Sequence, residues 1–175
     1  MTGAAPPQPA HPRPTTAWPD LAGRIVEAPD GRRHVLPVRV YFEDTDFSGL
    51  VYHVSYLRWC ERGRSDFLRL LGVHHTMLIA GAGATGSPTE PAAFVVRRMS
   101  LEYLGPARID EVLEVETRAG ALTAATLILH QAVRRDGQTL FTADVTVVLV
   151  GQSGKVLRLG PLLRQALGPG ERDAR

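Results

Sequence analysis

A carboxylate and an imidazole stand close to the point where an extended segment gives way to a helix. In the segment Val38–Leu57, Asp46 lies a short turn ahead of the predicted helix, and His53 lies close to the helix start. The first N–H groups of a helix have no partner within the helix and carry partial positive charge. They can polarise a carbonyl oxygen while a nearby carboxylate activates water or attacks. This combination is what acyl transfer to water requires.

The same carboxylates have a structural interpretation, which the residues alone leave equally open. Asp44 or Asp46 can satisfy N–H groups of the loop or of the helix start, as acidic N-caps do. Cys60 falls on the apolar face of the helix and is interpreted as a buried core residue. The adjacent His74 and His75 have no thiol or carboxylate at metal-ligand spacing, so no metal site is predicted.

Two elements must position these residues. A β-branched and aromatic run predicts a strand from His34 through Phe42, in which Pro37 is tolerated near the start of an edge strand. Apolar residues at intervals of three and four then predict one long helix, which Ser55 caps and Gly72 ends.

Four further β-type segments follow the helix, at about residues 92–104, 111–119, 121–135 and 138–150. Asp136-Gly137 is the strongest hairpin signal in the chain. A short terminal helix is predicted from Pro161 through Leu167. Gly63 costs about 1 kcal/mol relative to Ala inside a helix, so its presence indicates a close approach to a sheet. The order of elements predicts an α+β protein, with one mainly antiparallel sheet wrapped around a long central helix.

Length and composition limit the class of protein. The chain of 175 residues fits one domain, and 44% apolar residues with a mean hydropathy of −0.06 are typical of a soluble globular protein. No apolar run approaches the roughly 18 residues that span a bilayer, and no secretory signal follows Met1. We therefore expect a cytoplasmic protein without membrane insertion. A single cysteine excludes a disulfide within the chain. The chain has 20 basic and 18 acidic side chains, and the basic ones are spread along it, so no nucleic-acid partner is predicted.

The chain is predicted to have one folded domain with a less ordered segment at each end. Residues 1–33 hold seven of the 13 prolines and show no sustained periodicity, so they are predicted to form a disordered arm. Residues 34–168 are predicted to form the domain, and residues 169–175 a flexible C-terminal tail.

The stretch from Arg39 to Leu71 resembles the start of the acyl-CoA thioesterases associated with the Tol-Pal system, in the 4-hydroxybenzoyl-CoA thioesterase-like branch of the hotdog superfamily. The matching motifs are Val38-Arg39-Val40-Tyr41, Glu43-Asp44-Thr45-Asp46, Gly49-Leu50-Val51-Tyr52-His53, Ser55-Tyr56-Leu57 and Glu61-Arg62-Gly63-Arg64. The resemblance extends more weakly over about residues 34–167. It implies a hotdog fold, hydrolysis of the thioester of an acyl-CoA to a free carboxylic acid and CoA, and active sites at the subunit interfaces of a homodimer or homotetramer.

The resemblance also implies roles for single residues. Asp46 falls on the family's catalytic carboxylate and His53 on a histidine implicated in catalysis. The N–H groups around Tyr52 and His53 are expected to contact the thioester oxygen. The residues expected to line the site are Phe42, Gly49 and Val51. Phe42 departs from the family's usual Tyr and cannot donate a hydrogen bond, so either the hydroxyl is dispensable here or the substrate differs.

Coenzyme A carries phosphates that basic side chains bind. The candidates to bind these phosphates are Arg97, Arg98, Arg134, Arg135, Lys155 and Arg158.

No cofactor is expected, because CoA is part of the substrate and thioester hydrolysis needs neither a metal nor a redox group. Envelope-linked or acyl-carrier partners are compatible with the resemblance. The alternative function is that of a non-catalytic acyl-CoA-binding or scaffold hotdog protein, which would not need Asp46. The sequence fixes neither the acyl length nor the choice between general-base and anhydride routes.

Overall fold

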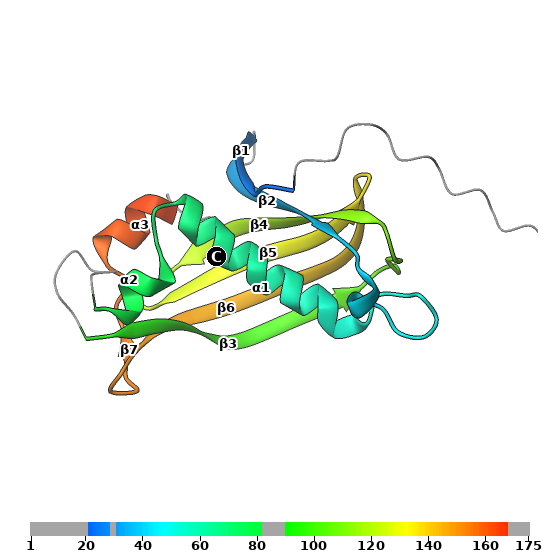
Figure 1. Cartoon of the computed structure of the whole chain (residues 1–175). Coiled ribbons are helices and arrows are strands. Elements are labelled where there is room, and N and C mark those ends of the chain that lie inside the picture. The colour runs from blue at the N-terminus through cyan, green and yellow to red at the C-terminus, as the bar shows by residue number, and fades with distance from the viewer. Residues whose placement is uncertain (1–20, 29–30, 82–89, 168–175) are drawn as a thin grey trace, which may run out of the picture.

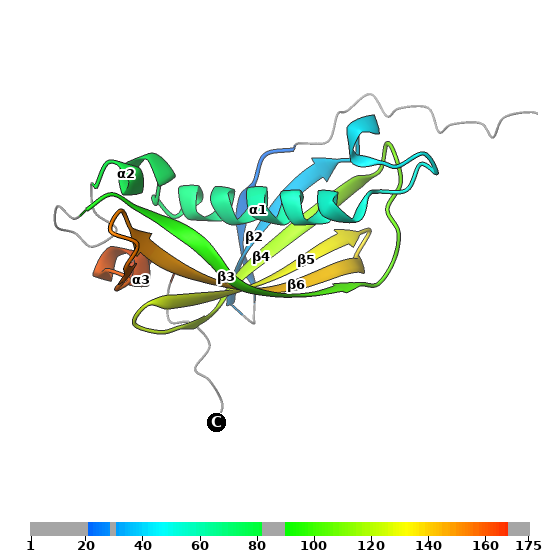
Figure 2. The same cartoon turned by 90° about the horizontal axis from the view of Figure 1, so that it is seen from below.

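A computed structural model describes residues 21–28, 31–81 and 90–167. Seven strands form one sheet in which every pair is antiparallel, and the long helix α1 (His53–Leu70) lies across one face of it (Figure 1, Figure 2). The α+β architecture expected from the sequence, a curved antiparallel sheet around one long helix, is confirmed.

The strands follow the order β1-β2-β4-β5-β6-β3, and β7 pairs with β6 beside this path. Their bounds are β1 Arg24–Ala28, β2 Gly31–Arg39, β3 Ala92–Tyr103, β4 Val112–Leu122, β5 Thr126–Arg135, β6 Gln138–Gly151 and β7 Val156–Leu157. Asp136 and Gly137 join β5 to β6 with φ of 49° and 81°, as a two-residue hairpin turn requires, so the predicted hairpin is confirmed. Among the described residues β3 pairs along its length only with β6, which leaves its other edge open.

Helix α1 is held close to the sheet at its middle. A Cβ at Gly63 would lie 3.1 Å from both Val115 Cγ1 and Thr117 Oγ1 on β4. Gln131 on β5 donates from Nε2 to the Cys60 carbonyl oxygen at 2.9 Å and to Thr117 Oγ1 at 2.8 Å. The close approach predicted from Gly63 is confirmed, and the glutamine fixes the helix to the sheet at that point.

The hydrophobic core lies between α1 and the sheet. Cys60 and Phe67 of α1 belong to one buried cluster with Leu113 and Val145 of the sheet. Burial raises the pKa of the Cys60 thiol to about 12, so this residue is the neutral core group that its helical position predicted. Gly72, with a φ of 81°, follows the helix where a left-handed stop was expected.

The N-terminal part of the fold corrects the prediction. Residues 24–28 and 31–33, predicted as part of a disordered arm, form β1 and the start of β2. β1 pairs with the neighbouring Gly31–Val35 of β2, and Arg24 forms an exposed ion pair with Glu114 of β4 at 3.5 Å. Residues 21–23 of the predicted arm form neither helix nor strand. Its residues 1–20 and 29–30, and the predicted tail at residues 169–175, lie outside the described residues.

The strand ahead of the helix is shorter than predicted. β2 ends at Arg39, and the chain then turns through the 3₁₀ helix η1 (Phe42–Asp44) instead of continuing as a strand. Within the described segments, β2 at Pro37 pairs only with β4, so this part of β2 is a sheet edge, where a proline is tolerated.

The start of α1 also differs from the prediction. The helix begins at His53, and Ser55 is not its cap but a buried residue whose Oγ donates to the Asp44 carbonyl oxygen at 3.2 Å. Two short helices follow in the chain, α2 (His75–Ile79) and the predicted α3 (Pro161–Leu167). None of the helices in the described part of the chain is long and apolar enough to cross a membrane.

Candidate active site

The loop between β2 and α1 forms a small hairpin that carries Asp46. Thr45 pairs with Val51 as an isolated bridge, and the Asp46 N–H donates to the Leu50 carbonyl oxygen at 2.9 Å. Gly49, with a φ of 76°, completes the turn in a conformation that favours glycine. Backbone hydrogen bonds therefore define where Asp46 stands.

This hairpin is anchored to the segment between β3 and β4. The Val51 N–H donates to the Ala107 carbonyl oxygen at 2.9 Å. The Tyr56 hydroxyl accepts from the Ala107 N–H at 2.9 Å and donates toward the Gly105 carbonyl oxygen at 3.4 Å. Burial raises the pKa of Tyr56, so its hydroxyl stays protonated and keeps both roles. The helix, the loop of Asp46 and the β3–β4 segment thus form one connected unit.

The two carboxylates of the loop have different partners. Asp44 is buried, and its Oδ2 accepts from the Tyr41 N–H at 3.0 Å. Asp46 is exposed, and its Oδ1 accepts from the Ser48 hydroxyl at 2.5 Å and from the Ser48 N–H at 2.8 Å. These hydrogen bonds, first the one from the Ser48 side chain, lower the pKa of Asp46. Asp44 is therefore a structural cap, whereas Asp46 stands as an ionised carboxylate at the surface.

Helix α1 begins with uncapped amide groups. Tyr52 occupies the N-cap position, its side chain makes no capping hydrogen bond, and no acidic residue lies in the first turn. Within the described parts of the chain, no group accepts a hydrogen bond from the N–H of His53 or Val54. The partial positive charge of the helix start is therefore available to an oxygen from outside the chain.

The His53 imidazole is exposed beside two tyrosine rings. Its centroid lies 4.3 Å from that of Tyr52 and 6.5 Å from that of Tyr103, which it meets edge to face. The Tyr103 hydroxyl donates to the His53 carbonyl oxygen at 3.1 Å and so ties the helix start to the end of β3. The Asp46 carboxylate makes its hydrogen bonds with Ser48 and not with this imidazole.

Large aromatic side chains of the same segment are exposed in the single chain. Phe42 is 82% exposed, Phe47 is fully exposed and Tyr52 is half exposed. Gly49 lies on the loop as expected, but Val51, predicted to line the site, is buried in the core. Exposed apolar surface of this extent, next to polar groups, is typical of a surface that another molecule covers.

The six candidates for CoA phosphates fall into three groups, in the middle of β3 (Arg97, Arg98), at the end of β5 (Arg134, Arg135) and around β7 (Lys155, Arg158). Arg134 and Arg135 form ion pairs with Glu116 and Glu111, at 3.6 and 2.9 Å. The β7 group lies at the opposite end of the sheet from the start of α1 (Figure 1). The single chain does not bring the six together.

Sequence reasoning missed the residues that support the loop from distant segments. They are Tyr56, Tyr103 and Ala107, together with Arg108, which bridges to Leu50. The sequence Gly105-Pro106 indicates a turn at this point but does not reveal what the turn contacts.

Comparison with known proteins agrees with this geometry. The chain matches the family described as Thioesterase superfamily over residues 48–142, more than half of its length. The acyl-CoA thioester hydrolase YbgC of Escherichia coli O6:H1 is 42% identical over 115 residues, which are 65% of this chain and 79% of that protein. The acyl-CoA thioesterase YbgC of Haemophilus influenzae is 37% identical over 114 residues, 65% of this chain and 78% of that protein.

A solved structure extends the agreement to three dimensions. The probable thioesterase from Bartonella henselae has a TM-score of 0.68 and 41% sequence identity, over 73% of this chain and 98% of that one. Taken with the curved sheet around α1, these matches show that the chain belongs to the thioesterase superfamily, has the hotdog fold and is a thioester hydrolase.

Proposed function

We propose that this hydrolase cleaves the thioester of an acyl-CoA, giving a free carboxylic acid and CoA. One observation carries the proposal: an ionised, exposed Asp46 stands on a fixed loop ahead of a helix whose first N–H groups, at His53, have no acceptor in the described chain. The relatives named as acyl-CoA thioesterases support CoA as the group that carries the acyl chain.

The Tyr52 N–H, expected from the sequence to contact the thioester oxygen, already donates to the Asp44 carbonyl oxygen at 2.8 Å. The proposed chemistry therefore begins with the thioester oxygen accepting hydrogen bonds from the N–H groups of His53 and Val54. These groups stabilise the charge that develops on oxygen, and removing one such donor costs about 10²- to 10³-fold in rate in hydrolases that use them. Asp46 takes the proton of an attacking water, or attacks the carbonyl carbon to give a mixed anhydride that water then cleaves. By either route the C–S bond breaks and the CoA thiolate takes up a proton, while His53 orients the thioester. Water, a carboxylate and backbone amides suffice for these steps, so the proposed mechanism uses no metal or redox cofactor.

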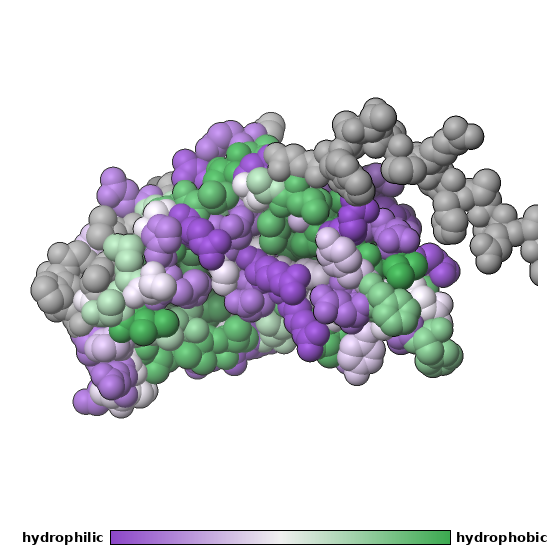
Figure 3. All heavy atoms as spheres, viewed as in Figure 1, coloured by the Kyte–Doolittle hydropathy of each residue, from purple (hydrophilic) through white to green (hydrophobic). Residues whose placement is uncertain are grey.

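A second copy of the chain is the proposed cover for the site. The open edge of β3 carries Val95, Val96 and Tyr103, which are 44 to 47% exposed. Figure 3 shows apolar side chains gathered along the side of the molecule where β3 runs in Figure 1. An unpaired strand edge is a template for another strand. We therefore propose a homodimer in which two β3 strands pair antiparallel. Assembly to a tetramer and envelope-linked or acyl-carrier partners stay predictions.

This pairing favours two of the six basic residues as contacts for CoA phosphates. Antiparallel pairing brings the Ala92 end of one β3 beside the Tyr103 end of the other, next to His53. Because β7 follows β6 at the Ala92 end, the partner subunit's Lys155 and the partner subunit's Arg158 come toward the site. Long cationic side chains at the rim of a site suit the phosphates of CoA.

A thiol-release assay with short, long and aromatic acyl-CoAs tests the proposal. Asp46→Asn is expected to lower kcat/KM by about 10²-fold or more, the contribution typical of a positioned acid or base. Glu43→Gln, which removes another exposed carboxylate from the same loop, is the matched control and should keep wild-type turnover. Equal turnover by the wild type and Asp46→Asn would remove Asp46 from the mechanism. Binding of acyl-CoA without turnover of any substrate would support the non-catalytic alternative.

A further inference from the structure

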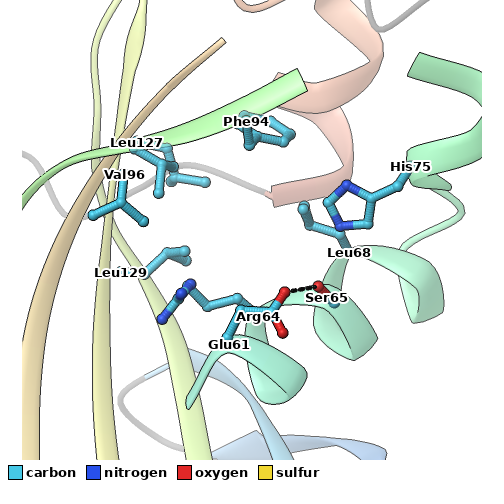
Figure 4. A pocket seen from close by; sticks show the side chains of 10 residues that line it. Glu61, Arg64, Ser65, Leu68, His75, Phe94, Val96, Leu127 and Leu129 are labelled. Atoms are coloured by element: carbon cyan, nitrogen blue, oxygen red, sulfur yellow. Dashed lines mark hydrogen bonds between the residues drawn. The ribbon is translucent and has the colours of Figure 1, made fainter. Parts of the chain in front are cut away.

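The sheet has an outer face, turned away from α1, and this face carries a cluster of arginines. Leu127 and Leu129 of β5 point toward the space between α1 and the sheet (Figure 4). Neighbouring side chains of a strand point to opposite faces, so His130, Ala132 and Arg134 of β5 lie on the outer face.

Strand pairing places a glutamate and two more arginines beside these residues. On β4, Glu116 lies opposite Ala132, and Arg118 lies opposite His130. On β2, Arg33 lies opposite Arg118. The short side chain of Ala132 leaves an open depression of about 390 Å³ between its longer neighbours, within the size range of small-molecule sites. We call it the outer depression, and it is lined by Glu116, Arg118, His130, Gln131, Ala132 and Arg134.

Three guanidinium groups share one carboxylate at this depression. Glu116 Oε1 accepts from Arg118 Nε at 2.7 Å. Glu116 Oε2 has only longer contacts, with Arg33 Nη1 at 3.4 Å and Arg134 Nε at 3.6 Å. Three positive charges around one negative charge leave a surplus of two positive charges.

Other carboxylates of the outer face do not cancel this surplus. Glu114, two positions along β4, forms an ion pair with Arg24 at 3.5 Å. Asp144 Oδ1 lies 2.6 Å from His130 Nδ1. Glu102 lies on β3, two strands away from β5, which is about 10 Å at the usual strand spacing.

Two of the guanidinium groups also have a buried donor without an acceptor. Arg33 Nε and Arg134 Nε are buried and have no hydrogen-bond partner among the described residues. The 3.6 Å contact between Arg134 Nε and Glu116 is an ion pair, too long for a hydrogen bond. Buried polar groups are nearly always hydrogen-bonded to protein, water or an ion. An anion supplies both an acceptor and negative charge, whereas water supplies only the acceptor.

We propose that the outer depression binds a phosphate group with two negative charges, either inorganic phosphate or the phosphate monoester of a free nucleotide. Such a group carries nearly two negative charges at pH 7 and several acceptor oxygens, which match the surplus charge and the arginine donors. The sheet lies between this depression and α1, so the site is separate from the proposed active site. Pairing of two chains through β3 extends the sheet and leaves the outer face open.

Thermal unfolding tests the proposal with inorganic phosphate, AMP and adenosine at about 10 mM, with KCl keeping the ionic strength constant. For a Kd of about 1 mM, phosphate or AMP should raise Tm by about 3–6 °C, and adenosine by less than about 0.5 °C. Equal shifts would support the phosphate group alone as the ligand, and a shift with AMP only would support a nucleotide. No shift with either would overturn the proposal.

Two variants locate the binding in the outer depression. Ala132→Glu places a carboxylate among the arginines, so it should raise Tm without ligand and abolish the shift with phosphate. Arg118→Gln removes one cation and should raise the Kd for phosphate about tenfold or more, measured by isothermal titration calorimetry. Arg98→Gln makes the same charge change on β3, outside the depression, and is the matched control that should keep the wild-type Kd.

An unchanged Kd in both Ala132→Glu and Arg118→Gln, or an equal loss of affinity in Arg98→Gln, would place the anion elsewhere and overturn the inference. Ala132→Glu should also keep the wild-type kcat/KM for acyl-CoA in the thiol-release assay. A tenfold loss there would assign the depression to the CoA of the substrate and overturn a separate site. The binding measurements need no turnover, so they test this inference independently of the proposed hydrolysis.

Discussion

Tyr56 joins the start of α1 to the β3–β4 segment that anchors the loop of Asp46, and Tyr56→Phe removes only the hydroxyl that makes this connection. The ring packs against Phe141 at 5.3 Å and Trp59 at 5.5 Å between centroids, and phenylalanine keeps these contacts. What the substitution deletes is the acceptor of the Ala107 N–H at 2.9 Å, and a longer contact with Gly105.

The expected loss follows from the burial of Ala107. This residue is fully buried, so water cannot replace the lost acceptor, and an unsatisfied buried N–H costs about 1–3 kcal/mol. We expect the free energy of unfolding to fall by that amount and Tm to fall by about 2–4 °C per kcal/mol. The Ala107 carbonyl also accepts from Val51, so movement of this segment shifts the loop of Asp46. Because misplacement by about 1 Å can cost 10²-fold in rate, kcat/KM should fall by about tenfold or more.

Tyr103→Phe is the matched control. Its hydroxyl also donates to a carbonyl oxygen, that of His53, but Tyr103 is 47% exposed in the single chain, and its loss leaves no buried N–H without a partner. Its free energy of unfolding should change by less than about 0.5 kcal/mol. Urea denaturation followed by circular dichroism measures stability, and the thiol-release assay measures turnover. If Tyr56→Phe has the free energy of unfolding and the kcat/KM of the wild type, this hydroxyl does not hold the loop. The explanation of how Asp46 is positioned would then be wrong.

Three further outcomes are expected. Ser48→Ala deletes the hydrogen bond that contributes most to the lowered pKa of Asp46, so the acid limb of the pH–rate profile should move to higher pH, and an unchanged limb would contradict that. Burial lowers the pKa of His34 from 6.5 although Asp66 lies 2.8 Å away. Because the folded state prefers neutral His34, the free energy of unfolding should fall as the pH decreases below 6.5. Urea denaturation at several pH values should show a steeper fall for the wild type than for His34→Gln. Gly63→Ala gains about 1 kcal/mol in helix propensity but forces the packed contacts at 3.1 Å apart, so it should destabilise by about 1 kcal/mol, and a net stabilisation would show that the helix can move.

Elements with a strong local signal were predictable from the sequence, and those that depend on distant partners were not. Helical spacing and the Asp136-Gly137 turn specify α1 and the β5–β6 hairpin without reference to the rest of the chain. β1 has no such signal, since it is five residues long and contains two charged side chains. Its place depends on pairing with β2 and on the backbone of Gly23, where a Cβ would collide with the Asp66 carboxylate of α1.

The candidate site shows the same division. The spacing of Asp46 and His53 around the helix start marks both residues as candidates in the sequence alone. The different roles of Asp44 and Asp46 follow from which N–H groups the folded loop directs at each carboxylate, and sequence spacing does not determine that. The outer depression around Ala132 was not predictable at all, because it depends on the register in which β4 pairs with β5.

The hydrogen bonds from Ser48 limit the kind of chemistry that Asp46 can perform. They keep its carboxylate ionised across the neutral range, but a lowered pKa also makes it a weaker base, and a general base works best when its pKa is near the working pH. In the proposed mechanism the rate must therefore come from the placement of the carboxylate and from the helix amides more than from basicity. In the proposed dimer, a second chain that covers the exposed Asp46 would remove water and raise its pKa, which would strengthen it as a base. The proposed pairing through β3 would then contribute to the reaction itself and not only to the assembly of the fold.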